Sequence, residues 1–104
     1  MVRVSVMYPT TDDGQFDMDY YKTTHTNLIK EKFNDPGFIR FEIDQGFGGA
    51  KPGSPPPYVA VGHIVFADKQ AFQQLMGAHA REINADVPNF TNIRPEVQIS
   101  EIVA

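Results

Sequence analysis

The sequence predicts an α+β fold in which four antiparallel strands form one sheet and two helices cover one of its faces. Hydrophobic residues recur at every second position in four segments and at helical spacing in two others. The order is strand, helix, strand, strand, helix, strand, which two right-handed crossovers assemble into a single sheet. A chain of 104 residues has the length of one domain, so we expect residues 1–104 to form one unit.

The first strand is expected at residues 2–8, where valines alternate with other residues until Pro9 ends the pattern. The first helix is expected to begin at Asp17, whose carboxylate can accept from free backbone N–H groups. At about 100° per residue, Tyr20 points away from the apolar stripe of this helix. That stripe consists of Met18, Tyr21, His25, Leu28, Ile29, Lys32 and Phe33.

Alternating and helical patterns continue through the rest of the chain. Alternating segments at 38–47 and 58–66 are separated by a loop rich in glycine and proline, and a last strand is expected at 97–103. Asp68 is expected to cap the second helix. The apolar stripe of that helix consists of Phe72, Leu75, Met76, His79 and Ile83.

This is the ferredoxin-like arrangement, which leaves one face of the sheet uncovered. If Val2, Val4, Val6 and Tyr8 face the helices, apolar residues of the later strands are expected on the open face. Soluble monomers rarely expose an apolar surface of that size. We therefore expect a homodimer in which two sheets pack together about a two-fold axis.

Composition excludes several classes of function. Nine basic and thirteen acidic residues give a net charge of −4, so the basic face that binds nucleic acid is not expected. The chain has no cysteine, which excludes disulfides and thiolate chemistry. It has neither a signal-peptide pattern nor an apolar run of about 20 residues that could span a bilayer. We therefore expect a cytoplasmic protein without a membrane partner.

His25 is the most informative residue for chemistry. It lies in the middle of an apolar helical stripe, one turn after Tyr21. Imidazole suits proton transfer because its ordinary pKa is near neutrality, and a phenol one turn away can orient it or bind a substrate oxygen. The alternative is a buried histidine that is satisfied by a single hydrogen bond.

The other candidates are less specific. His79 holds the equivalent place on the second helix, so the two histidines either line one pocket or are satisfied separately. The alternation does not settle which face of the sheet carries His63, and Tyr8 can direct its hydroxyl to a cavity or to water. No histidine pair has chelate spacing, so no metal site is expected. The phenylalanines that can line or fill a cleft are Phe41, Phe66, Phe72 and Phe90.

Two polar residues, Asp86 and Asn89, follow the second helix. They can close over a pocket, but capping and turn formation are the favoured interpretation for such residues.

Five segments together resemble one family. The chain reads Val-Ser-Val-Met-Tyr-Pro at 4–9, Phe-Asp-Met-Asp-Tyr-Tyr-Lys-Thr-Thr-His at 16–25 and Pro-Tyr-Val-Ala-Val-Gly-His at 57–63. It continues with Val-Pro-Asn-Phe-Thr at 87–91 and Pro-Glu-Val-Gln at 95–98. In this order they resemble the EthD family, which is named for a protein encoded beside an ether-degrading cytochrome system.

The resemblance implies a dimeric α/β barrel whose ligands occupy the cleft between helices and sheet. Relatives in this superfamily include cofactor-free monooxygenases, isomerases, polyketide cyclases and haem-degrading proteins. By position, the helix histidine of the family corresponds to His25, and Tyr20 and Tyr21 form the preceding pair. Nicotinamide and flavin motifs are absent from the sequence.

Three functions follow as hypotheses. The first is a cofactor-independent enzyme, of oxygenase or isomerase type, for an apolar or aromatic oxygenated metabolite. In it His25 is the acid or base, and Tyr21 or Tyr8 holds a substrate oxygen. The second is a non-catalytic ligand-binding dimer that supports a catabolic oxygenase. The third is haem binding by His79 or His25.

Overall fold

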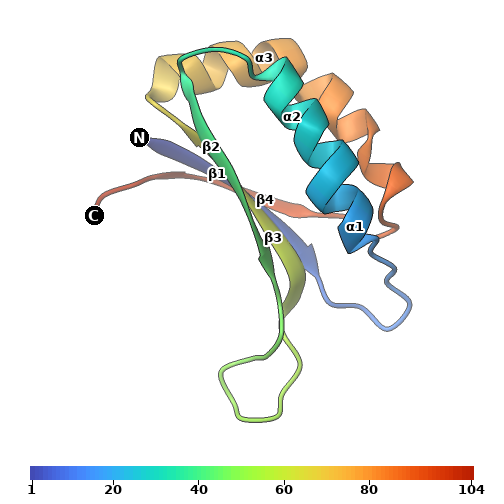
Figure 1. The fold of residues 1–104 in the computed structure, drawn as a ribbon. Helices are drawn as coiled ribbons and strands as arrows, with labels where there is room; N and C mark the ends of the chain where they lie inside the picture. Colours follow the sequence, from blue (N-terminus) through green and yellow to red (C-terminus); the bar gives the residue numbers. More distant parts are fainter.

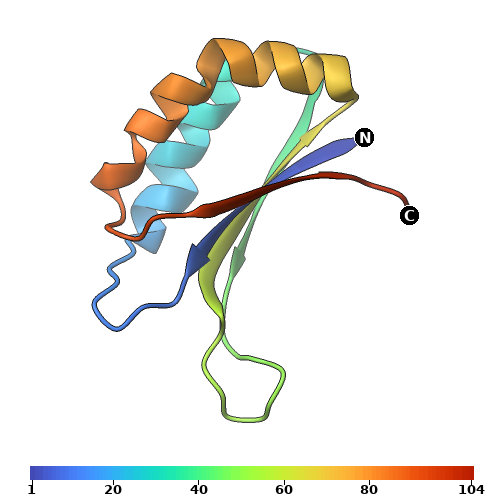
Figure 2. The same ribbon diagram turned by 180° about the vertical axis from the view of Figure 1, so that it is seen from behind.

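The computed structural model describes all 104 residues and places four antiparallel strands in one sheet. The strands are β1 (Val2–Pro9), β2 (Phe38–Gln45), β3 (Tyr58–Phe66) and β4 (Glu96–Glu101), in the spatial order β2-β3-β1-β4. Figures 1 and 2 show from opposite sides that the helices lie on one face of this sheet. The expected α+β ferredoxin-like fold is confirmed.

The first helical segment has three parts: α1 (Met18–Tyr20), a π-helical turn η1 (Tyr21–His25) and α2 (Thr26–Lys32). Asp17 caps it as expected, because its Oδ1 accepts from the Tyr20 backbone N–H at 3.0 Å.

The second helix, α3 (Lys69–Ala85), is capped by Asp68, which accepts from the Ala71 backbone N–H at 2.8 Å. A short 3₁₀ turn, η2 (Val87–Asn89), follows it. No helix is long and apolar enough to cross a membrane.

Strand register decides which side chains meet the helices. Val4 of β1 lies opposite Ile64 of β3 and Ile99 of β4, and Phe41 of β2 lies opposite Ile64. Because side chains alternate along a strand, one row of apolar residues crosses the sheet on its helical side. The buried residues that form the main core are Val4, Ile29, Phe33, Ile64, Phe66, Leu75 and Ile83.

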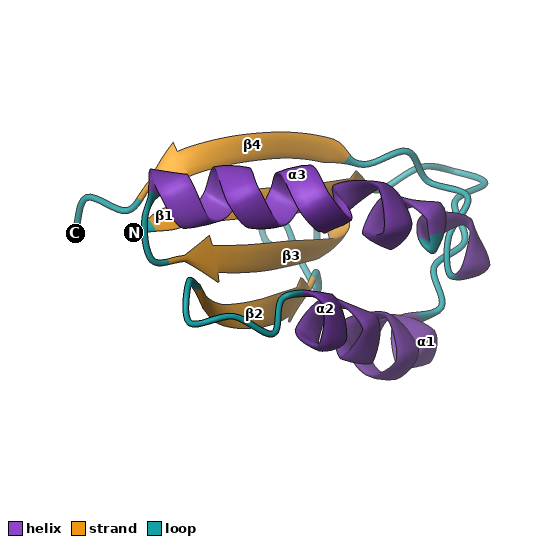
Figure 3. Cartoon of the chain, turned by 90° about the horizontal axis from the view of Figure 1, so that it is seen from above, coloured by secondary structure: helices purple, strands orange, loops and turns teal.

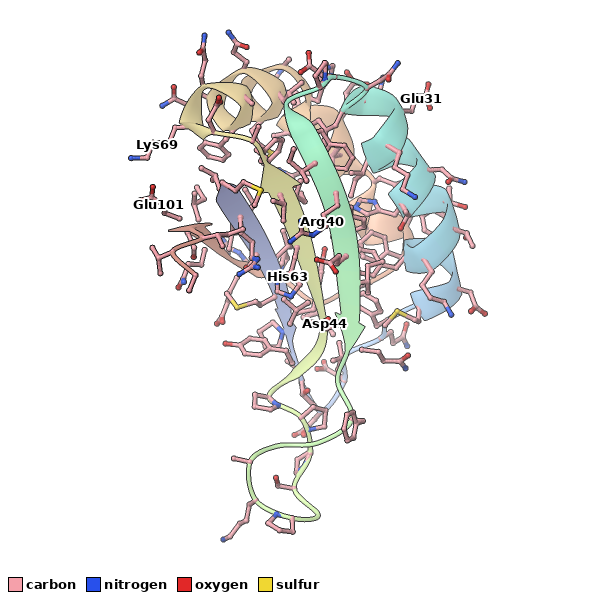
Figure 4. All side chains as sticks on the ribbon, turned by 60° about the vertical axis from the view of Figure 1, so that its left-hand side comes forward. Glu31, Arg40, Asp44, His63, Lys69 and Glu101 are labelled. Carbon is pink, nitrogen blue, oxygen red and sulfur yellow. The ribbon has the colours of Figure 1, made fainter.

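The expectation of an apolar open face is wrong for β2 and β4 but not for β3, whose Val61 and Val65 lie on that face with Met7 of β1. The same register puts the apolar alternates of β2 and β4 on the helical side, so mainly polar side chains face outward. Figure 4 shows Arg40, His63 and Asp44 together on this face. The polar residues of the open face are Arg3, Ser5, Arg40, Glu42, Asp44, His63, Glu96, Gln98 and Ser100.

The exposed apolar side chains lie elsewhere. Val97 and Ile99 are 58% and 56% exposed on the helical side of β4, which runs along the sheet edge beyond α3 (Figure 3). β2 ends at Gln45 rather than at Phe47. Phe47 is consequently 99% exposed in the loop that projects beyond the sheet in Figure 1.

Candidate active site

A cleft of about 140 Å³ lies between the helical layer and the sheet. Its walls are mainly apolar, with side chains from β1, α2, α3 and β4. The polar side chains that reach it are Tyr8, Tyr21, His25 and Asn84. An apolar cleft with a few convergent polar groups is typical of a small-molecule site.

The π-helical turn places two of these groups. It spans Tyr21–His25, and the Tyr21 carbonyl accepts from both the backbone N–H of Thr26, five residues on, and the Thr26 hydroxyl, the latter at 2.7 Å. In an ordinary α-helix, side chains five residues apart point about 140° away from each other. The i→i+5 winding brings Tyr20 and His25 to the same side instead. The expectation that Tyr20 points away from His25 is therefore wrong.

One carboxylate joins both side chains. The Oδ2 of Asp86 lies 2.9 Å from Nδ1 of His25, and its Oδ1 accepts from the Tyr20 hydroxyl at 2.7 Å. The side-chain amide of Asn89 donates to the same Oδ1 at 2.9 Å. Burial opposes the charge on Asp86, but the hydrogen bonds from Asn89, His25 and Tyr20 outweigh it, so the pKa of Asp86 is lowered.

These contacts define the protonation of His25. Burial lowers the pKa of its imidazole, and the neighbouring Asp86 offsets only part of that effect. His25 is therefore neutral at pH 7. An ionised carboxylate can only accept, so the proton lies on Nδ1 and the lone pair on Nε2. His25 is 3% exposed, and its Nε2 has no hydrogen-bond partner. This nitrogen is nevertheless not sealed inside the protein, because the only fully enclosed side-chain atom without a partner is Nδ1 of His79. Nε2 therefore opens on the cleft that His25 lines.

Two neutral phenols stand beside this base. Tyr8 and Tyr21 are each 1% exposed and both line the cleft. Burial raises the pKa of Tyr8 to about 12, although the Tyr21 hydroxyl offsets part of the rise. Burial and the neighbouring Tyr8 likewise raise the pKa of Tyr21. Both hydroxyls therefore keep their protons and can donate to an oxygen of a ligand.

Gly62 of β3 makes room for Tyr21. A Cβ at this position would collide with the Tyr21 hydroxyl and press on the Phe41 ring. The missing side chain lets the phenol lie against the sheet, where the aromatic rings of Tyr8, Phe41 and Phe90 also contact it. This glycine is thus a requirement of the site.

The structure brings Tyr8, Tyr21, His25 and Phe41 together around the cleft. Phe90 packs on His25, with ring centroids 4.7 Å apart, but does not line the cleft. Phe72 lies with Ile99 in a separate depression.

The other two histidines lie away from His25. His79 packs on Phe33, with ring centroids 6.0 Å apart, and His63 lies on the open face of the sheet, where it contacts Asp44 at 2.8 Å and Ser5 at 3.3 Å. The three histidines therefore do not share a pocket, and no cluster of three His, Asp or Glu side chains is placed to hold a metal.

The sequence pattern favours capping and turn formation for Asp86 and Asn89, and it predicts that Tyr20 points away from the helical stripe that carries His25. Sixty-one residues separate Asp86 from His25, and no local pattern predicts a contact at that distance. The five-residue spacing of Tyr20 and His25 indicates proximity only once the π-helical turn is known.

Comparison with known proteins identifies the family. The sequence model of the EthD domain matches residues 9–94. The chain belongs to the EthD family. No curated protein matches this EthD chain.

Solved structures agree with this assignment. An EthD-like protein from Ralstonia eutropha JMP134 is 33% identical, with a TM-score of 0.90 over 99% of this chain and 92% of the other. An ethyl tert-butyl ether D family protein from Bacillus halodurans C-125 is 18% identical, with a TM-score of 0.74 over 99% of both chains. SnoaB, a cofactor-independent oxygenase from Streptomyces nogalater, shares the fold at 12% identity, with a TM-score of 0.58 over 97% and 90% of the two chains.

The space at Gly62 can be tested by substitution. Gly62→Ala should lower the free energy of unfolding by about 1–3 kcal/mol, because the new methyl group displaces the Tyr21 hydroxyl. Gly77→Ala is the matched control, since no atom lies within 4 Å of a Cβ there. In a helix interior that change should raise stability by about 0.5–1 kcal/mol. Urea unfolding measures both, and equal effects would contradict the packing described here.

The lowered pKa of His25 should make stability depend on pH. The unfolded chain takes up this proton near the ordinary pKa of 6.5, whereas the folded protein takes it up only at lower pH. The contribution of His25 to the free energy of unfolding should therefore be complete above about pH 6.5. It should fall as pH drops from about 6.5 towards the folded pKa. Urea unfolding of wild type and His25→Gln between pH 5 and 8 measures the difference. A pH dependence unchanged by the substitution would contradict the lowered pKa.

Proposed function

We propose that this EthD protein is a cofactor-independent enzyme that removes a proton from a small, apolar, oxygenated metabolite. The observation that carries the proposal is the neutral His25 held by Asp86 at 2.9 Å, with its free Nε2 opening on an apolar cleft. EthD membership and the shared fold of SnoaB support a role in small-molecule catabolism.

The chemistry needs four side chains from this chain. Nε2 of His25 accepts a proton from an acidic carbon or hydroxyl of the substrate, and Asp86 stabilises the imidazolium that results. The hydroxyls of Tyr8 and Tyr21 donate to the oxygen on which negative charge develops. If His25 returns the proton to another carbon, the reaction is an isomerisation. If dioxygen captures the carbanion, the reaction is an oxygenation.

Cleft size limits the substrate. A cavity of about 140 Å³ is close to the roughly 150 Å³ of an engineered protein cavity that binds benzene. We therefore infer a substrate with a single ring or similar bulk. The cleft is smaller than the roughly 300–1,000 Å³ of sites for drug-sized ligands, which argues against haem at His25.

A ligand-binding auxiliary dimer is the second candidate, because the same enclosed apolar cleft can bind a metabolite without converting it. The two functions differ in what His25 contributes. A carrier keeps binding when the imidazole is removed, whereas the enzyme loses turnover.

The isomerisation of 3-cyclohexenone to 2-cyclohexenone, followed by ultraviolet absorbance, tests the enzyme. It needs only abstraction and return of a proton, and the probe has one ring and one oxygen. Wild type should accelerate the reaction, and His25→Ala should lower the rate about 10²–10⁴-fold. The rate should rise with pH through the lowered pKa of His25 and level off by pH 7, because the neutral imidazole is the base.

Two controls accompany this assay. Tyr8→Phe should reduce the rate, whereas Tyr58→Phe should not, because Tyr58 bonds Glu96 outside the cleft. An oxygen electrode reports whether dioxygen is consumed. Saturable binding of the ketone without turnover by wild type, and unchanged binding by His25→Ala, would overturn the enzyme and favour the carrier.

We also propose that the functional unit is a homodimer formed through the open face of the sheet. This face carries charges of both signs, and Arg3 has no ion-pair partner in its own chain. Arg40 pairs with Glu42, and His63 with Asp44, on the same face. A face of mixed charge can meet its own copy without uniform repulsion.

Association should stabilise the folded chain by mass action. The midpoint of thermal unfolding should therefore rise with protein concentration, and sedimentation should give twice the mass of 11.6 kDa. Arg3→Glu should shift both measurements toward the monomer, whereas Lys69→Glu on α3 should not. A monomeric mass with a midpoint independent of concentration would contradict the dimer.

A further inference from the structure

The cleft opens to solvent between the end of α3 and the start of β4. Most residues that line it are buried or half-buried, and the two exposed ones are Asn84 on α3 and Val97 on β4. Figure 2 shows that the end of α3 and the start of β4 lie at the same end of the molecule. A ligand too long for the cleft of about 140 Å³ therefore leaves it between Asn84 and Val97.

A second, open depression lies outside this mouth. It shares Asn84, Val87, Pro95 and Val97 with the cleft, so the two cavities are continuous. The rest of its wall comes from η2 and from the loop that joins η2 to β4. This wall is mainly polar, whereas that of the cleft is mainly apolar.

Arg94 is the only charged residue that lines the outer depression. It makes no ion pair within its own chain. Two polar neighbours already have partners, because the Thr91 hydroxyl donates to the Gln15 carbonyl and the Asn92 amide bonds the backbone of Gln15 and of residue 13. The guanidinium of Arg94 and the amide of Asn84 are therefore the polar groups left free for a ligand.

The chemistry of this depression favours a carboxylate. The planar fork of an arginine matches the two oxygens of a carboxylate. Phosphate sites usually add several backbone N–H donors, but those of residues 89–91 and 93 already donate within this loop. A charge is costly to bury in an apolar cavity, and the mouth lets a charged group stay outside while an apolar ring lies inside.

We propose that the substrate carries a carboxylate, which passes between Asn84 and Val97 and binds Arg94 while the apolar part lies beside His25. This inference rests on the proposed function, since it names the substrate class of the same site. Arg94 then determines specificity for anions and sets which substrate atom meets Nε2 of His25. Its positive charge also attracts an anion locally to a chain whose net charge is −4.

Three ligands test the proposal: phenylacetate, 3-phenylpropionate and 4-phenylbutyrate. Each joins one ring to a carboxylate through a methylene chain of different length, and the matching primary amides are neutral ligands of equal size. Isothermal titration calorimetry at pH 7 should show that wild type binds at least one carboxylate about tenfold more tightly than its amide. This preference should shrink as salt is added.

Substitutions assign the preference to Arg94. Arg94→Gln should abolish it, and Arg94→Lys should keep part of it, because an ammonium retains the charge but not the fork. Lys69→Gln is the matched control, since it removes one positive charge at the opposite end of α3, outside both cavities. It should leave the preference intact. The preferred carboxylate should also compete with 3-cyclohexenone, because its ring occupies the cleft.

The outcomes separate the ligand class from the enzyme. Failure of wild type to bind any of the carboxylates, equal affinity for each acid and its amide, a preference that survives Arg94→Gln, or binding without competition would overturn the carboxylate site. Turnover of 3-cyclohexenone by wild type, which involves no carboxylate, would then leave the enzyme standing. A preference that depends on Arg94 in a protein without turnover would support the ligand class and overturn the enzyme.

Discussion

The site depends on one partly buried carboxylate. Asp86 follows α3, yet its two oxygens hold Tyr20 and His25 on the first helical segment. Without that anchor, the imidazole is free to turn and either ring nitrogen can carry the proton. With it, Nε2 is the only ring nitrogen of His25 left to react. The position of the base and its tautomer follow from this contact, whereas its neutral state at pH 7 follows from burial, which lowers the pKa of His25 more than Asp86 raises it.

The surrounding structure makes such a carboxylate tolerable. An unpaired polar group in an apolar interior is costly, so buried polar groups persist when their partners are complete. Asp86 accepts from an imidazole, a phenol and an amide. The first helical segment supplies two of those donors, His25 from the π-helical turn and Tyr20 from the residue just before it. π-Helical turns occur frequently at functional sites, and this one has a clear geometric purpose.

Local patterns predicted the fold well. The caps at Asp17 and Asp68 and the strand at 58–66 follow from residue type and alternation alone. The sequence predicts less well which side chains lie on the helical face of the sheet and which on the open face, because the register between strands decides this. His25, Tyr21, Tyr8 and Phe41 could be found from periodicity. Asp86 and Tyr20 could not, since their roles depend on a contact across 61 residues and on a non-standard helical turn.

Nitrogen-15 NMR of the imidazole rings observes the protonation of His25 directly. The His25 ring should be neutral at pH 7, with the proton on Nδ1 and a lone pair on Nε2. Asp86→Asn should change this tautomer, whereas Asp44→Asn, which removes the partner of His63, should leave it unchanged. A charged ring at pH 7, or a neutral ring with the proton on Nε2, would contradict the account.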